Sequence, residues 1–143
     1  MTSNKILKLM KEKEVEYVDL RFTDPRGKLQ HLTIDAKVVD ESMLNDGVYF
    51  DGSSIAGWKA INESDMILKP DLERQVIDPF TSHNTLILFC DVLDAVKKDP
   101  YERDPRSIAK KAEAYLKKTG IGDKAYFGPE AEFFVFDNVK FKN

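Results

Sequence analysis

The stretch Val15-Glu16-Tyr17-Val18-Asp19-Leu20-Arg21-Phe22-Thr23 decides how the first part of this chain folds. Its apolar and polar residues alternate, as in a half-buried β-strand whose successive side chains point to opposite faces. The next four residues, Asp24-Pro25-Arg26-Gly27, are typical of a turn, because proline presets its own φ and glycine accepts positive φ. Residues 29–34 alternate again, so residues 15–34 are predicted to form a β-hairpin.

Helical signals lie on both sides of this hairpin. Residues 3–12 place apolar side chains at helical spacing, and Ser3 is a candidate N-cap for them. After the hairpin, Asp40 to Leu44 predict a brief helical turn that Gly47 ends. The chain therefore begins as a mixture of helix and antiparallel strands.

The middle of the chain shows less periodicity. Residues 48–72 include several turn-forming residues and Pro70, so we expect mostly a long ordered loop. Long loops inside domains tend to be functional or disordered, and the aromatic and apolar content here argues against disorder. Further strands are expected at Val76-Ile77 and at Leu86–Leu93, where Cys90 is expected to be a buried small hydrophobe.

The charged stretch 94–104 predicts a domain boundary near residues 100–104. Asp104 can cap a helix that starts with Pro105 and that Gly120 ends. The expected apolar stripe of this helix consists of Ile108, Ala109, Ala112, Tyr115 and Leu116. A strand is expected from Ala125 to about Val139, and the overall order of elements predicts an α+β fold.

Composition excludes several classes of protein. The 143 residues carry a net charge of −3, which argues against nucleic-acid binding, since phosphate contacts need a basic face. We find no apolar run of the roughly 20 residues that a bilayer-spanning helix needs, and no signal peptide. The single cysteine cannot form an internal disulfide, which together with the missing signal peptide indicates the cytoplasm. We therefore expect a cytoplasmic protein, and the charge and the short apolar runs predict no nucleic-acid or membrane partner.

Two acidic segments are candidates for chemistry. In the predicted last strand, Glu130 and Glu132 share a face with Phe134 and Phe136. Two carboxylates at this spacing can bind hard cations such as Mg²⁺ or Mn²⁺, although a solvated pair of glutamates has the same pattern. In Asp51-Gly52-Ser53-Ser54, a carboxylate held in a compact turn can attract a cation or accept a proton, or it can form an ordinary Asx turn.

The remaining polar candidates carry weaker signals. Asn62-Glu63-Ser64-Asp65 can be a solvated acidic loop as readily as a site. His31 and His83 have no sequence neighbour that indicates a catalytic triad or a zinc site, so we expect structural roles for both.

Several segments together resemble the N-terminal part of bacterial, type I glutamine synthetases. The matching segments are VDLRFTD at 18–24, FDGSSI at 50–55, GWK at 57–59, INESDM at 61–66, RDPRSIAK at 103–110 and FGPEAEFF at 127–134. The resemblance implies a β-grasp domain over residues 1–104, followed over residues 105–143 by the start of the catalytic α/β domain. It also implies that the chain is an N-terminal fragment. This fragment is expected to have no synthetase activity alone, because most of the ATP site lies downstream of it.

The resemblance implies an activity and roles for individual residues. In such enzymes ATP phosphorylates the γ-carboxylate of glutamate, and ammonia displaces the phosphate to give glutamine. Glu130 and Glu132 match ligands of the divalent metals, Mg²⁺ or Mn²⁺. Asp51 matches the aspartate associated with ammonium, Ser54 a second contributor to that pocket, and Asp65 a neighbouring loop residue. The family assembles as a dodecamer of two hexameric rings, in which these N-terminal residues enter the neighbouring subunit's site.

Three departures from the family pattern concern loop geometry more than chemistry, and two alternative functions stay open. Ala131 stands where the family usually has proline, and Ala56 and Ala60 stand where glycine is usual. One alternative is a γ-glutamyl polyamine synthetase, which keeps the ligase chemistry but changes the nitrogen donor. The other is a β-grasp interaction module without catalysis.

Overall fold

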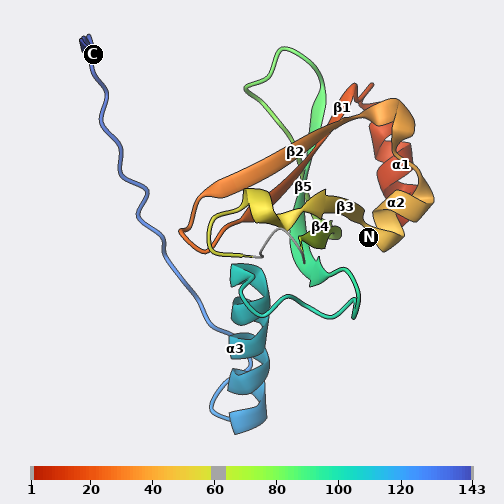
Figure 1. Ribbon diagram of the computed structural model, residues 1–143, viewed down its shortest axis with the longest axis vertical. Helices are drawn as coiled ribbons and strands as arrows, with labels where there is room; N and C mark the ends of the chain where they lie inside the picture. The colour runs from red at the N-terminus through yellow and green to blue at the C-terminus, as the bar shows by residue number, and fades with distance from the viewer. Residues whose placement is uncertain (1, 59–63, 143) are drawn as a thin grey trace.

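One mixed β-sheet organises the first hundred residues of the chain (Figure 1). The structure, a computed structural model, describes residues 2–58 and 64–142. Its elements in chain order are α1 (Ser3–Glu12), β1 (Tyr17–Thr23), β2 (Leu29–Asp35), the 3-10 helix η1 (Ala36–Val38), α2 (Glu41–Asp46), β3 (Val48–Asp51), the 3-10 helix η2 (Gly52–Ser54), β4 (Asp65–Ile77), β5 (Thr85–Asp94) and α3 (Pro105–Thr119).

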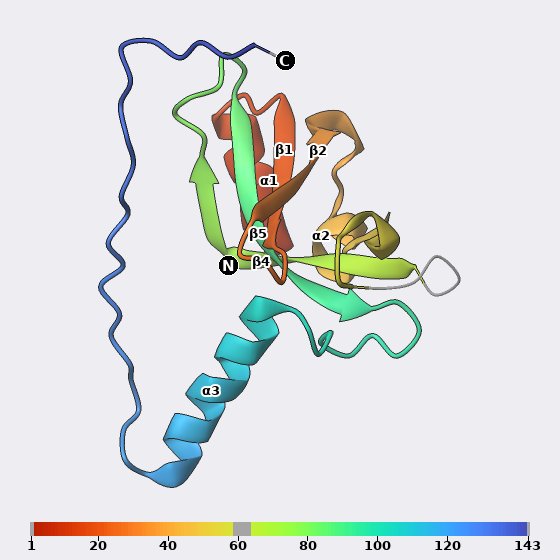
Figure 2. The same ribbon diagram turned by 60° about the vertical axis from the view of Figure 1, so that its left-hand side comes forward.

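The strands lie in the order β2-β1-β5-β4-β3. β1 pairs with β5 in parallel, and the other neighbours are antiparallel (Figure 2). The predicted hairpin is confirmed, with Leu20 opposite Leu32 and a turn in which Gly27 has a φ of +83°. The sheet with its helices confirms the predicted α+β class.

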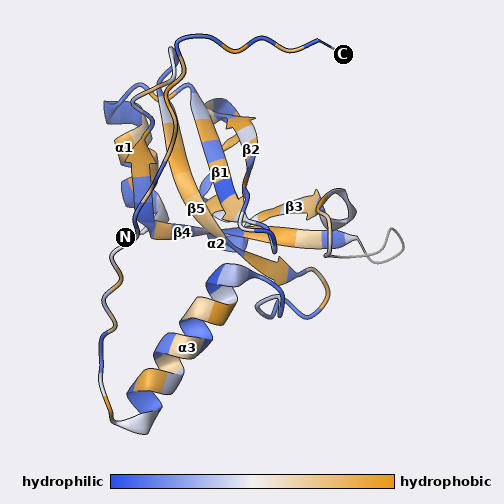
Figure 3. Cartoon of the chain, turned by 90° about the vertical axis from the view of Figure 1, so that its left-hand side faces the viewer, coloured by the Kyte–Doolittle hydropathy of each residue, from blue (hydrophilic) through white to orange (hydrophobic). Residues whose placement is uncertain are grey.

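The core lies between the sheet and the helices α1 and α2. Side chains that point to this face are buried, and Ile6 of α1 and Leu20 of β1 have no exposed surface. Figure 3 shows β5 as a largely apolar strand at the centre of the sheet. Cys90 of β5 is fully buried, as predicted, and burial raises the pKa of its thiol above the usual range.

The helix ends test the predicted caps. The predicted helix over residues 3–12 is confirmed, but Ser3 does not cap it. Ser3 is the first helical residue, and its hydroxyl donates instead to Glu41 of α2 over 3.0 Å. For α2 the prediction holds, because the Asp40 side chain accepts from the Met43 N–H at 2.7 Å and Gly47 ends the helix at a φ of +89°.

The prediction of a long loop over residues 48–72 is wrong in large part. This stretch contains β3, η2 and the first half of β4. The periodicity of β4 is weak because Met66, Ile67 and Leu68 are buried in succession, although their side chains alternate between the two faces of the sheet. The pairing of β4 with β5 shifts register between Pro70 and Gln75, which accommodates a proline within the strand.

The second part of the chain begins as predicted and then departs from the prediction. Asp104 caps α3, Pro105 is its first residue, and Gly120 ends it in the left-handed conformation. The predicted strand over residues 125–139 is wrong, because residues 120–142 contain no strand and the tail does not join the sheet (Figures 1 and 2). A strand needs a hydrogen-bonded neighbour, and the described residues place none beside this tail. The predicted stripe of α3 is mostly exposed, Ile108 at 53% and Tyr115 at 69%.

Candidate functional site

The end of β3 brings together the three residues predicted to form an ammonium site. Asp51 is the last residue of β3, and its Cα partner on β4 is Asp65. Ser54 follows in η2, and the Gly52 N–H donates to the carbonyl of Ser64 over 2.7 Å, which closes the turn onto β4. Asp51, Ser54 and Asp65 are all exposed. The predicted residues Asn62 and Glu63 lie outside the described residues.

Hydrogen bonds fix the carboxylate of Asp51. It accepts from the Ser53 hydroxyl at 2.6 Å and from the Ser53 N–H at 2.8 Å, so the turn is an Asx-type cap of η2. The Ser53 hydroxyl, the Ser53 N–H and the Ser64 hydroxyl together lower the pKa of Asp51 below its usual range. The site therefore holds an exposed, ionised carboxylate that can attract a cation.

An aromatic cluster supports this turn from the core side, and the sequence did not predict it. Trp58, which is 6% exposed, stacks on Phe22 of β1 with ring centroids 5.6 Å apart. Its ring edge also meets Phe50 of β3 at 6.1 Å and Tyr101 at 5.8 Å. Aromatic pairs at these distances add to the stability gained by burial, so the turn rests on a rigid base.

Glu130 and Glu132 lie apart from this turn. Both are exposed and both belong to the extended tail that follows α3. Carboxylates suit Mg²⁺ or Mn²⁺, so the donor chemistry fits the predicted metals. Within residues 2–58 and 64–142, however, no group of three or more histidine, cysteine or acidic residues can hold a metal ion. The two glutamates therefore supply at most part of a metal site in this structure.

A charged cluster on the sheet face opposite α1 is a second feature that the sequence did not predict. Asp19, which is 4% exposed, accepts from Arg21 at 2.7 Å, His31 at 2.9 Å and Thr33 at 2.8 Å. Arg21 also donates to Asp78 over 2.8 Å. Burial opposes ionisation of Asp19, but these hydrogen bonds outweigh it and hold the pKa of Asp19 below its usual range.

Both histidines thus have acidic partners, although the sequence indicated none. His31 bonds to Asp19, and His83 lies 3.2 Å from Glu16. The hairpin register was the available signal for the first pair, because it places His31 opposite Arg21 and Thr33 opposite Asp19 on one face. The first contact links β1 and β2, and the second links the residues that precede β1 and β5, in agreement with the expected structural roles.

A third set of charges fastens α3 to the sheet. Arg106 donates to Asp71 of β4 at 2.6 Å and to Asp91 of β5 at 2.9 Å, and Lys110 also bonds to Asp91. Burial opposes ionisation of Asp91, but the bonds from Lys110 and Arg106 lower its pKa overall. The start of α3 is therefore held against the same strand, β4, that carries Asp65.

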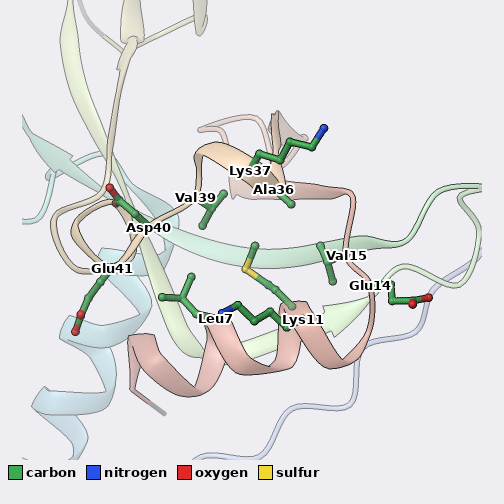
Figure 4. Close-up of a pocket in the computed structure, with 10 residues that line it drawn as sticks. Leu7, Lys11, Glu14, Val15, Ala36, Lys37, Val39, Asp40 and Glu41 are labelled. Carbon is green, nitrogen blue, oxygen red and sulfur yellow. The ribbon is translucent and has the colours of Figure 1, made fainter.

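The groove in Figure 4 contains none of the predicted site residues. It lies between α1 and the connection from β2 to α2, has a volume of about 470 Å³, and includes Leu7, Val15 and Val39 in its lining. Its lining is mainly apolar, with charged side chains such as Lys11 and Asp40 at the rim. This chemistry differs from that of the exposed acidic turn at Asp51.

Sequence comparisons identify the family. The model of the glutamine synthetase β-grasp domain matches residues 14–95, and that of the glutamine synthetase catalytic domain matches residues 102–143. The curated glutamine synthetase of Rhizobium meliloti (strain 1021) is 64% identical over 141 residues, which are 99% of this chain and 30% of that protein. That of Methylococcus capsulatus is 61% identical over 140 residues, 98% of this chain and 30% of that protein. The chain thus spans 30% of the length of these relatives.

Solved structures share the fold. A cryoEM structure of Plasmodium falciparum glutamine synthetase superposes with a TM-score of 0.76 at 24% identity, over 84% of this chain and 23% of that chain. A structure described as apo GmaS without ligand gives a TM-score of 0.71 at 22% identity, over 80% of this chain and 26% of that chain. In the described part of our chain, no helix is long and apolar enough to span a bilayer. From its β-grasp sheet and both family matches, we conclude that the chain belongs to the glutamine synthetase family.

Proposed function

We propose that the full-length protein ligates ammonia to glutamate in an ATP-dependent reaction that passes through γ-glutamyl phosphate and serves glutamine biosynthesis. The observation that carries the proposal is the Asp51 turn. An exposed carboxylate with a lowered pKa ends β3 opposite Asp65 and three residues before Ser54. The relatives that match 98–99% of this chain are named glutamine synthetase.

The turn has the chemistry that ammonium requires. Ammonium is a cation, and an ionised carboxylate attracts it by charge. It must then lose a proton before its nitrogen can attack the acyl phosphate, and a carboxylate within hydrogen-bonding reach can accept that proton. We assign these two tasks to Asp51, with Ser54 and Asp65 as polar neighbours of the bound cation.

Glu130 and Glu132 are the residues that we assign to Mg²⁺ or Mn²⁺. Divalent metals neutralise the charge that develops on phosphate oxygens during phosphoryl transfer. The two glutamates would hold metal through their carboxylate oxygens, with further ligands and most of the ATP site supplied by residues outside this chain. For this reason we expect residues 1–143 alone to show no synthetase activity.

We also propose how the chain is divided and assembled. Residues 1–104 form the β-grasp domain, and residues 105–143 begin the catalytic domain. In a cytoplasmic dodecamer of two hexameric rings, the Asp51 turn enters the neighbouring subunit's site while Glu130 and Glu132 serve their own. This arrangement is consistent with the placement of Asp51 at the end of β3 in the sheet and of the two glutamates in the tail after α3, which does not join the sheet (Figure 1).

Product analysis of the full-length protein with different nitrogen donors tests this function. We expect ATP-dependent formation of glutamine from glutamate and ammonium, with residues 1–143 inactive in the same assay. A preference for a polyamine over ammonium would replace this proposal by the γ-glutamyl polyamine ligase. Failure to ligate any amine would favour a non-catalytic β-grasp module, against which the catalytic-domain match over residues 102–143 already argues.

A further inference from the structure

The segment that follows Asp51 is built from two successive tight turns. The Ile55 N–H donates to the carbonyl of Gly52 at 3.1 Å, and the Trp58 N–H donates to the carbonyl of Ile55 at 3.2 Å. Gly57 lies within the second of these turns at a φ of +88°, which favours glycine. Because the two turns share Ile55, a shift at Gly57 is passed along the backbone to Ser54 and Asp51.

Arg103 holds this segment from a distant part of the chain. Its Nη1 donates to the carbonyl oxygen of Gly57 over 2.9 Å, across 46 residues of sequence. Two residues earlier, Tyr101 packs edge-on against Trp58. Residues 101–104, which we call the junction segment, therefore contact the turn both through a charged donor and through an aromatic ring.

The junction segment is itself fixed to the sheet. The Tyr101 N–H donates to the carbonyl of Val92 on β5 over 2.8 Å. Asp104 is fully buried, and its side chain accepts from the Ser107 hydroxyl at 2.7 Å and from the Val92 N–H at 3.4 Å. Arg103 therefore lies between two residues that are bonded to β5 or to α3. Its own backbone is held in place, so its bond to Gly57 restrains the turn.

This contact connects the two family matches. Gly57 lies in the segment that matches the β-grasp model, residues 14–95, and Arg103 lies in the segment that matches the catalytic model, residues 102–143. The guanidinium group of Arg103 therefore links the Asp51 turn to the start of the catalytic segment.

We propose that Arg103 is a positioning residue for ammonium use, which acts by holding the Asp51 turn through the carbonyl of Gly57. The inference rests on the proposed function of Asp51. Arg103 contacts the turn and not Asp51 itself, so its loss removes no reacting group but lets the turn that carries Asp51 move. A smaller fraction of enzyme molecules then holds Asp51 in the geometry that binds ammonium, which raises the apparent KM for ammonium. Saturating ammonium shifts the population back to that geometry.

Steady-state kinetics of the full-length enzyme test this proposal. For Arg103→Ala we expect the KM for ammonium to rise about three- to tenfold, the effect of losing one charge-assisted hydrogen bond at an exposed site. We expect little change in kcat at saturating ammonium or in the KM values for glutamate and ATP. Arg103→Lys should restore most of the loss, because a single N–H donor suffices. Arg74→Ala, which removes an exposed arginine of β4, is the matched control.

A double mutant separates this inference from the proposed function. If Arg103 acts through the turn, Arg103→Ala should change the KM for ammonium less than about twofold in an Asp51→Asn background, since the two effects are then not additive. An unchanged KM in Arg103→Ala, or equal effects in both backgrounds, would overturn the positioning role while leaving the Asp51 assignment intact. If Asp51→Asn itself leaves the KM for ammonium unchanged, the proposed function of Asp51 fails instead. A fall in kcat with all KM values unaltered would also contradict the positioning role.

Discussion

Replacing Gly52 with alanine tests the packing beneath the Asp51 turn. A Cβ atom at this position would lie 2.2 Å from Met66 Sδ, 2.8 Å from Met66 Cγ and 3.0 Å from the carbonyl oxygen of Ser64. Met66 is fully buried and the Gly52 N–H is bonded to that same Ser64 oxygen, so neither neighbour moves freely. Overpacking of this kind costs about 1–3 kcal/mol of unfolding free energy.

Urea unfolding of the 143-residue chain measures this cost. With a loss of about 2 kcal/mol and an m-value of about 2 kcal/mol/M, the midpoint of Gly52→Ala should fall by about 1 M. Gly128→Ala is the control, because a Cβ there meets no atom within 4 Å. Its midpoint should stay within about 0.3 M of wild type, as expected for a surface change. Equal midpoints for Gly52→Ala and wild type would refute the close contact between the turn and Met66.

Three further predictions concern buried groups. Asp104→Ala removes the acceptor for the Ser107 N–H and hydroxyl, so α3 should lose helical far-UV circular dichroism and the chain about 2 kcal/mol of unfolding free energy. Because the pKa of Asp19 is lowered in the folded state, its stabilisation is present above its unfolded pKa of about 3.9 and is lost as pH falls further. The stability advantage of wild type over Asp19→Asn in urea should therefore shrink below about pH 4, and a constant difference would contradict the network. Cys90, fully buried with a raised thiol pKa, should resist iodoacetamide until urea unfolds the chain, as mass spectrometry can show.

Local signals in the sequence predicted a large part of the fold. The hairpin was readable because its alternation and its Asp-Pro-Arg-Gly turn act within a few residues. The same is true of α3, whose start at Asp104 and end at Gly120 depend on side-chain caps and backbone conformation. The Ser3 prediction failed because a hydroxyl in the first helical turn found a tertiary partner, Glu41.

Long-range pairing explains what the sequence did not predict. Residues 65–72 of β4 were interpreted as loop because they show little periodicity and contain Pro70, whereas a strand was predicted at Val76-Ile77. The pairing with β3 and β5 that stabilises β4 is a long-range effect. The approach of Asp65 to Asp51 follows from that pairing, so the geometry of the turn was also hidden. The bond from Arg103 to Gly57 joins two loops and carries no periodic signal at all. For the tail, the apolar pattern around Phe134 predicted a strand that has no neighbour among the described residues.

The KM for ammonium of full-length Asp51→Asn tests the central claim most directly. The substitution keeps the shape of the side chain but removes the charge that should attract ammonium. We predict a rise of at least about tenfold in this KM, since loss of a charged interaction costs about 1.5–3 kcal/mol. Asp99→Asn, which changes an exposed aspartate between β5 and α3, should leave it unchanged. Equal KM values for ammonium in Asp51→Asn and wild type would contradict the account.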